Sequence, residues 1–207
     1  MWWLAGGAGL VVLGAFGAWA YVKLTIETPA YAVAEREGRF ELRDYPALRV
    51  AEVITQGPRE QAVRDGFRPL ARYIFARERE GDKIAMTAPV TQERVAQGAS
   101  EWRVRFVMPS QYDLDDLPRP AFSDVRLVET QPARMAAIRF SGRWQDARME
   151  QREAELRRWI EAQGLMTVGP PVYAYYDDPF TPGFMRRNEV LIEVAPPPAP
   201  ALAAPAS

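Results

Sequence analysis

The sequence predicts an α+β domain in which two helices pack on an antiparallel sheet of about eight strands, with approximate two-fold internal symmetry. Three observations support this class. Short runs alternate apolar and polar residues, which is the period of strands. Two longer stretches place apolar residues at helical spacing. The pattern of the first half recurs in the second half at a nearly constant offset, which indicates a duplicated unit.

The first half opens with two predicted strands. Residues 40–45 alternate and stop at Pro46, and residues 48–56 are rich in Val and end at Gly57. Residues 25–38, which precede them, show no such pattern, so we expect a connector there.

A helix is predicted after these strands. Its apolar face recurs at i, i+4, i+7 and i+11, formed by Val63, Phe67, Leu70 and Ile74. Pro69 lies inside this segment and removes an internal hydrogen bond, which costs about 3 kcal/mol in a helix interior. We therefore expect a kink or a restart near Gly66.

The segment 83–90, Lys-Ile-Ala-Met-Thr-Ala-Pro-Val, also alternates, and it is predicted to form a strand that ends, or lies at an edge, at Pro89. Residues 102–108 alternate as a further strand. The loop after them contains Asp113, Asp115 and Asp116, but it lacks the spacing and the closing Glu of a calcium loop, so we interpret it as a solvated turn.

The second half repeats this order. The sequence predicts strands at 125–130 and 134–141, a helix over 146–163 that Gly164 closes, and strands at 171–176 and 189–194. Pro46-Ala47 corresponds to Pro132-Ala133, Gly57 to Gly142, and residues 70–74 to 156–160, at offsets of 85 or 86 residues. We expect a cleft where the halves meet, lined or flanked by the helices.

Both ends of the chain differ from this middle part. Residues 2–22 carry no charge, and a helix of this length spans about 30 Å, so segment 1–24 is predicted to be a transmembrane anchor. The alternative is a cleaved signal peptide, because residues 18–20 read Ala-Trp-Ala. Residues 195–207 are rich in Pro and Ala, which predicts a disordered tail.

The side of the membrane stays open. The basic residues near the span, Lys23, Arg36 and Arg39, follow it, and by the positive-inside rule they favour a cytoplasmic domain. A periplasmic domain is the alternative for this single-pass membrane protein.

The composition excludes several function classes. The chain has no His and no Cys, which excludes Ser-His-Asp and Cys-His nucleophiles, the usual zinc sites, and His- or thiolate-ligated haem. With 26 basic and 27 acidic residues intermixed, it offers no broad attraction for nucleic acid. We therefore expect no nucleic-acid partner and no metal site built from protein ligands.

Four stretches resemble one known family: Asp44-Tyr45-Pro46, residues 69–74, the segment 83–90, and Tyr176-Asp-Asp-Pro-Phe-Thr-Pro-Gly-Phe-Met-Arg-Arg-Asn-Glu-Val190. In this order they are similar to the SOUL family of haem-binding proteins. The resemblance spans about residues 31–194 and implies a distorted antiparallel barrel, similar to the effector-binding domains of some bacterial transcription activators. It places a SOUL-like domain at 39–194, with one repeat over 39–109 and the other over 124–194.

The resemblance implies binding of haem or another tetrapyrrole. Some members are thought to use an axial His and others an apolar pocket without one, and this chain can only be of the second kind. The expectation is therefore a membrane-anchored, non-catalytic domain that binds haem, a porphyrin or another amphipathic anionic molecule without covalent attachment. Two alternatives remain: an interaction or scaffold domain with no such ligand, and an enzyme that acts on a hydrophobic small molecule through carboxylate or Tyr chemistry.

The family pocket is associated with the first helix and with the loop before Arg186-Arg187-Asn188-Glu189. In this sequence it implies the following ligand-binding residues: Val63, Arg64, Phe67, Arg68, Ala71, Arg72, Phe180, Phe184 and Met185. The three arginines fall at i, i+4 and i+8, where they could pair with propionates or form a solvated basic stripe. Met86 and Tyr176 are weak candidates for iron ligands, because a strand Met is usually core filling.

Overall fold

The computed structural model of the chain describes residues 26–96 and 98–195. The predicted anchor at 1–24 and the tail beyond residue 195 lie outside the described residues. Within the described ranges, neither helix has the length and apolar character that a membrane crossing needs.

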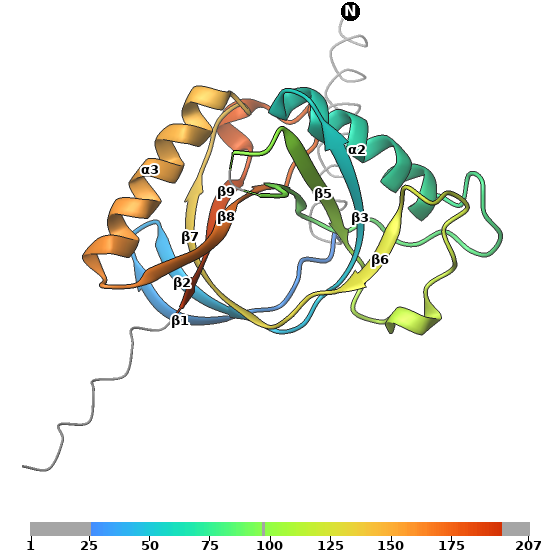
Figure 1. Cartoon of the computed structure of the whole chain (residues 1–207), viewed down its shortest axis with the longest axis horizontal. Coiled ribbons are helices and arrows are strands. Elements are labelled where there is room, and N and C mark those ends of the chain that lie inside the picture. The colour runs from blue at the N-terminus through green and yellow to red at the C-terminus, as the bar shows by residue number, and fades with distance from the viewer. Residues whose placement is uncertain (1–25, 97, 196–207) are drawn as a thin grey trace, which may run out of the picture.

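The described residues form one open antiparallel sheet of nine strands that carries two helices (Figure 1). The strands are β1 (Ala32–Glu37), β2 (Phe40–Tyr45), β3 (Arg49–Gln56), β4 (Val90–Arg94), β5 (Glu101–Val107), β6 (Arg126–Glu129), β7 (Ala133–Phe140), β8 (Met166–Tyr175) and β9 (Asn188–Ala195). The helices are α2 (Arg59–Ile74) and α3 (Asp146–Ala162), and two short 3₁₀ turns are η1 (Leu114–Asp116) and η2 (Gly183–Met185). The α+β class with two helices is therefore confirmed.

The strand order is β1-β2-β7-β9-β8-β4-β5-β3-β6, which is symmetric about the β8–β4 pair except for the edge strand β1. On one side of this pair β3, α2, β4 and β5 follow one another along the chain, and on the other side β7, α3, β8 and β9 do so. A duplicated β-α-β-β unit would give this order. The sheet curves strongly, but β1 and β6 remain as edges, so the barrel is open, and its nine strands compare with the prediction of about eight.

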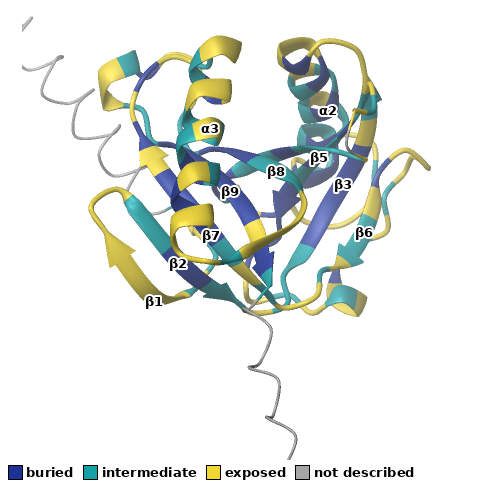
Figure 2. Ribbon diagram, turned by 60° about the vertical axis from the view of Figure 1, so that its left-hand side comes forward, coloured by how far each residue is buried: buried dark blue, intermediate teal, exposed yellow. Residues whose placement is uncertain are grey.

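Both helices lie on the outer face of the curved sheet (Figure 1). Helix α2 packs on β3 and β5, and α3 packs on β7, β8 and β9. Figure 2 shows the buried residues concentrated beneath the two helices. Gly66 allows the close approach of α2, because a Cβ there would lie 2.6 Å from Cγ2 of Val104 on β5. Pro69 is accommodated inside α2, which continues from Arg59 to Ile74 without the expected restart near Gly66.

The predicted strand at 83–90 is wrong. Only Val90 belongs to β4, and Thr87 forms an isolated bridge with Glu27. The backbone donors of this segment bond elsewhere: the N–H of Ile84 donates to the Ile74 carbonyl at the end of α2, and the N–H of Ala88 donates to the Glu27 carbonyl. The Ala88–Pro89 peptide bond is cis. The alternating pattern therefore reflects an extended segment between helix and sheet.

Strand β1 lies inside the predicted connector and was missed. All six of its residues are exposed, and it pairs only with β2 (Figure 2). An exposed edge strand lacks the alternating burial from which strands are predicted.

Candidate ligand-binding groove

A groove of about 350 Å³ lies on the inner face of the sheet, opposite the helices. Side chains alternate between the two faces of a strand, so β5 directs Val104 and Phe106 into the core under α2, while Arg105 and Val107 line the groove. We expected the helices to line or flank the cleft, but no residue of α2 or α3 lines this groove.

The lining of the groove is mainly apolar. Nine aliphatic or thioether side chains contribute to it: Leu48, Val50, Val107, Val128, Ala133, Met135, Val168, Val172 and Leu191. Five prolines add rigid apolar rings: Pro29, Pro46, Pro89, Pro132 and Pro170. Because proline has no backbone N–H, these positions present no unpaired donor to an apolar ligand.

The segment 27–31 crosses the sheet at one end of the groove. The Glu27 carbonyl accepts a hydrogen bond of 2.9 Å from the N–H of Ala88, and its carboxylate accepts one of 2.8 Å from the N–H of Ser110. Four residues later the ring of Tyr31 lies 5.0 Å from the ring of Tyr45. Pro29, between these two attachment points, lines the groove. The segment before β1 thus completes a wall of the site.

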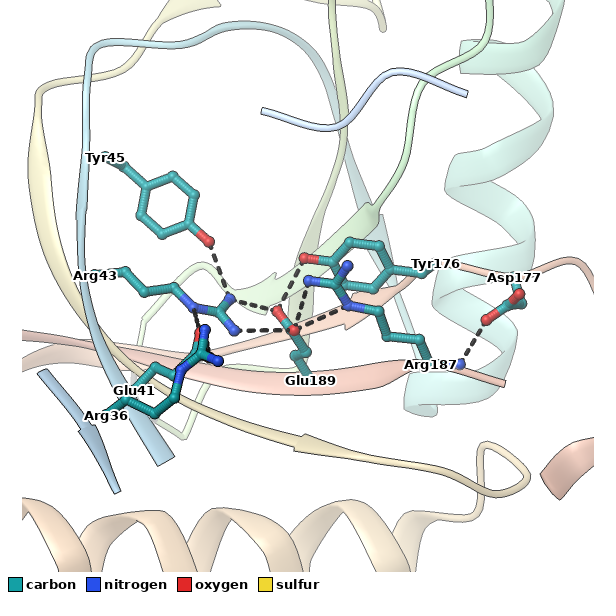
Figure 3. Close-up of polar contacts among 8 residues, drawn as sticks. All are labelled: Arg36, Glu41, Arg43, Tyr45, Tyr176, Asp177, Arg187 and Glu189. Carbon is teal, nitrogen blue, oxygen red and sulfur yellow. Dashed lines mark hydrogen bonds and ion pairs between the residues drawn. The ribbon is translucent and has the colours of Figure 1, made fainter. Parts of the chain in front are cut away.

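A buried ion-pair cluster lies next to the groove (Figure 3). Glu189 on β9 is fully buried and accepts hydrogen bonds from Arg43 Nη1 (2.7 Å) and Nη2 (3.1 Å), from Arg187 Nη2 (2.8 Å) and from the Tyr176 hydroxyl (2.9 Å). Burial alone would raise the pKa of Glu189, but the bonds and charges of Arg43 and Arg187 outweigh it and hold that pKa below its usual value. The carboxylate is therefore ionised and fully engaged.

Two tyrosines of this cluster also line the groove. The Tyr45 hydroxyl accepts a hydrogen bond of 3.2 Å from Arg43 Nη1, and burial raises the pKa of Tyr45 to about 12 although Arg43 opposes this. Burial and the Glu189 carboxylate raise the pKa of Tyr176 further, while the Arg187 guanidinium stacks 3.8 Å from its ring centre. Both rings stay neutral phenols. Among the described residues, no acceptor is found for the proton of the Tyr45 hydroxyl.

A second charged cluster borders the other side of the groove. Glu52 on β3 pairs with Arg105 (2.9 Å), Arg126 (2.6 Å) and Arg103 (3.4 Å), and Glu93 on β4 pairs with Arg103 (2.7 Å) and Arg105 (3.0 Å). Burial alone would raise the pKa of Glu52, but its contacts with the arginines, Arg105 above all, outweigh burial and hold that pKa below its usual value. Arg105 and Glu93 reach the groove, so this wall presents paired rather than free charge.

The predicted residues on α2 lie on the outer side of the sheet. Val63 and Phe67 pack into the core, with the Phe67 ring 5.2 Å from that of Phe106. Arg64 is largely exposed, and Arg72 pairs with Glu78 at 3.3 Å. Arg68 is exposed, and Ala71 is half-buried. None of these residues lines the groove.

The predicted residues of the distal loop extend outward. Phe180 is 93 % exposed, Phe184 81 % and Met185 36 %. Of the two candidate iron ligands, Tyr176 lines the groove, whereas Met86 is exposed and lies outside it. Among the residues that the structure describes, no three Asp or Glu side chains gather closely enough to hold a metal ion.

Apart from Tyr176, the residues that line the groove were not among the predicted site residues, and Tyr45 and Arg105 are examples. A signal for them exists in the strands that are apolar on both faces. Val107 follows Phe106, and Leu191 lies beside Val190 and Ile192, so each strand has apolar side chains on the face away from the helix as well. Such strands indicate that both faces of the sheet are covered or enclose a cavity.

The fold and the groove define a two-unit antiparallel α+β domain with an inner cavity of ligand size. The family profile described as "SOUL heme-binding protein" matches residues 26–193. The chain therefore belongs to the SOUL heme-binding protein family, which confirms the resemblance drawn from its motifs.

Curated relatives agree with this assignment. The chain is similar to Heme-binding protein 1 of Sus scrofa, with 27 % identity over 143 residues that cover 66 % of this chain and 74 % of the relative. It is similar to Heme-binding protein 2 of Homo sapiens, with 33 % identity over 110 residues, 48 % of this chain and 53 % of the relative. For Heme-binding protein 2 of Mus musculus, identity is 27 % over 176 residues, with coverages of 80 % and 84 %.

Solved structures share the fold at low sequence identity. The crystal structure of the EcmrR C-terminal domain matches with a TM-score of 0.60 at 13 % identity, covering 80 % of this chain and 98 % of that one. A hydrolase from Listeria innocua matches with a TM-score of 0.56 at 13 % identity, with coverages of 78 % and 94 %. At this identity the likeness shows the fold alone.

Proposed function

We propose that this protein binds haem or another tetrapyrrole in the inner groove, reversibly, without a covalent bond and without catalysis. The observation that carries this proposal is the groove of about 350 Å³ with its apolar lining. Ligand pockets measure about 300–1,000 Å³, so this groove lies at the lower end and a macrocycle would be partly inserted. Membership of the family supports the ligand class.

The groove residues fit a planar anionic ligand. The aliphatic side chains and the rings of Tyr45 and Tyr176 would contact the faces of the macrocycle. Its carboxylates would accept a hydrogen bond from the Tyr45 hydroxyl, which donates to no acceptor among the described residues. They would accept another from Arg105, whose Nε and Nη1 already pair with Glu52 and Glu93. A charge-assisted bond to arginine is the stronger type.

Iron ligation by the protein is not part of this proposal. Tyrosine ligates ferric haem as the phenolate, but the raised pKa of Tyr176 and its hydrogen bond to Glu189 disfavour that form. Met86 lies outside the groove. Binding that depends on the faces and carboxylates of the macrocycle should be the same with and without iron.

A non-catalytic role is also supported by the state of the buried carboxylates. A general acid or base works best with a pKa near the operating pH. Glu189 and Glu52 have lowered pKa values and are held by arginines, so they remain ionised structural partners.

Titration of the full chain with hemin and with metal-free protoporphyrin IX tests the ligand. We expect the affinities for hemin and for protoporphyrin IX to agree within about twofold, because only a protein ligand to the iron would make hemin bind more tightly. A flat response to both compounds at micromolar concentration would exclude tetrapyrrole binding, and a strong preference for hemin would require an iron ligand.

Two substitutions test the position of the site. Thr91→Phe adds a bulky ring to the lining of the groove and should weaken binding at least tenfold, whereas Arg64→Glu on α2 should leave it unchanged. The reverse pattern would move the ligand to the outer surface that the family resemblance implies. Circular dichroism of both variants controls for folding.

We further propose that residues 2–22 anchor the chain in a membrane as a single-pass protein, on the evidence of their length and lack of charge. The basic residues that follow favour a cytoplasmic domain over a periplasmic one. Fusions of reporters to the C-terminus that are active on one side of the membrane would decide between them.

A further inference from the structure

The loop between β8 and β9, residues 176–187, exposes two large aromatic side chains. Phe180 and Phe184 are 93 % and 81 % exposed, more than any other large apolar residue that the structure describes. Met185 beside them is partly exposed as well. Exposed apolar patches on soluble domains mark surfaces that bind other molecules or lipid.

The loop is built to hold these rings outward. The Asp178 carboxylate accepts hydrogen bonds from the N–H of Phe180 (2.7 Å), the N–H of Thr181 (2.9 Å) and the Thr181 hydroxyl (2.8 Å). The Arg186 Nε donates to the Thr181 carbonyl at 2.7 Å, and the N–H of Arg187 donates to Asp177. Because these polar groups are paired within the loop, its contact with an apolar phase leaves few of them unsatisfied.

The loop emerges at the same end of the sheet as the N-terminal segment. Strand β8 leads into the loop at Tyr175, which pairs with Val90 at the start of the antiparallel strand β4. Just before Val90, Thr87 bridges to Glu27, close to the first described residue. The described chain therefore begins at the same end of the sheet as loop 176–187, and the uncharged run 2–22 precedes it in the sequence.

Other side chains at this end suit a lipid surface. Met86, 38 % exposed, belongs to the segment that bridges to Glu27. Lys83 in the same segment is exposed, and so is Arg143, which packs against Gly183 of the loop. Apolar side chains flanked by basic ones are typical of surfaces that lie in the membrane interface.

We propose that this end of the domain rests on the bilayer, with Phe180 and Phe184 inserted between lipid headgroups. This rests on the proposed anchoring through residues 2–22. The occupant is the lipid surface and not a protein partner, because the apolar loop lies next to the segment of the chain that has the length and composition to enter the same bilayer.

Site-specific probes test the proposal, since the chain has no Cys of its own. Phe184→Cys carries an environment-sensitive NBD label. The matched control is Met166→Cys, which is also exposed but lies at the opposite end of β8. The full chain is reconstituted without ligand into vesicles of phosphatidylcholine and phosphatidylglycerol, and lipids with nitroxide-labelled acyl chains serve as quenchers.

We expect blue-shifted emission and several-fold stronger quenching of the label at position 184 than of the label at position 166. If the chain floats with the vesicles but both labels remain in water, the loop proposal is overturned and the anchor stands. Equal quenching of both labels would overturn the orientation. A chain that does not float with the vesicles would overturn both the anchor and the loop contact. None of these outcomes depends on tetrapyrrole binding, because no ligand is present.

Discussion

Replacing Glu189 by Gln is expected to destabilise the domain strongly, and a matched control on the same strand is available. The substitution keeps the shape of the side chain but removes the charge that holds Arg43 and Arg187. Arg43 is only 2 % exposed, so its guanidinium would lose its main buried partner and keep Glu41 at 2.7 Å.

Removing one partner of a buried ion pair lowers the free energy of unfolding by about 3–5 kcal/mol, because the other charge stays buried without compensation. For a domain of this size each kcal/mol lowers Tm by about 2–4 °C, so Glu189→Gln should lower Tm by roughly 6–20 °C. Glu193→Gln is the control. Glu193 also lies on β9 and also faces the groove, but it is exposed and no ion pair to it is found among the described residues, so its replacement should change stability by less than about 0.5 kcal/mol.

Differential scanning calorimetry at neutral pH measures the shift, and its pH dependence tests the cause. The lowered pKa of Glu189 contributes stability that is present above its unfolded value of 4.5 and is lost as the pH falls through the folded pKa. The difference between wild type and Glu189→Gln should therefore shrink in acid. Equal Tm values for the Glu189 and Glu193 variants at neutral pH would refute the reasoning.

Two further predictions concern the core and the tyrosines. Gly66→Ala places a Cβ 2.6 Å from Cγ2 of Val104, so it should destabilise the domain by about 1–3 kcal/mol in urea unfolding, and an unchanged midpoint would contradict the close packing of α2. Burial raises the pKa of Tyr45, Tyr73 and Tyr175 from 10.0 to about 12. Because the unfolded tyrosines lose their protons first, stability should fall as the pH rises from 10 towards 12, and absorbance titration of the folded and urea-unfolded chain checks this order.

Much of the fold could be predicted, because seven strands and both helices carry periodic apolar patterns that survive in the structure. Two segments could not. Strand β1 is exposed along its whole length, so no burial pattern marks it. The segment 83–90 alternates like a strand, yet its backbone bonds go to the end of α2 and to Glu27, which are contacts that only the assembled fold provides.

The site was less predictable than the fold. Family resemblance directed attention to α2 and to the distal loop, where charge and aromatic residues are evident in the sequence. The groove is made instead by single residues from many strands, such as Val50, Met135 and Leu191, and by the curvature of the sheet. Sequence periodicity gives the face on which a residue lies, but it does not give the curvature that turns the inner face into a cavity.

Residues 27–31 determine where a truncated form of the domain can begin. A truncation that begins at β1 would keep every strand and helix, yet it would remove Pro29 and Tyr31 and leave the groove without one wall. The same residues connect directly to the predicted anchor. Under the proposed anchoring, tension on the N-terminal segment would act on the wall of the groove itself, so attachment to a membrane would be mechanically linked to the shape of the proposed ligand site.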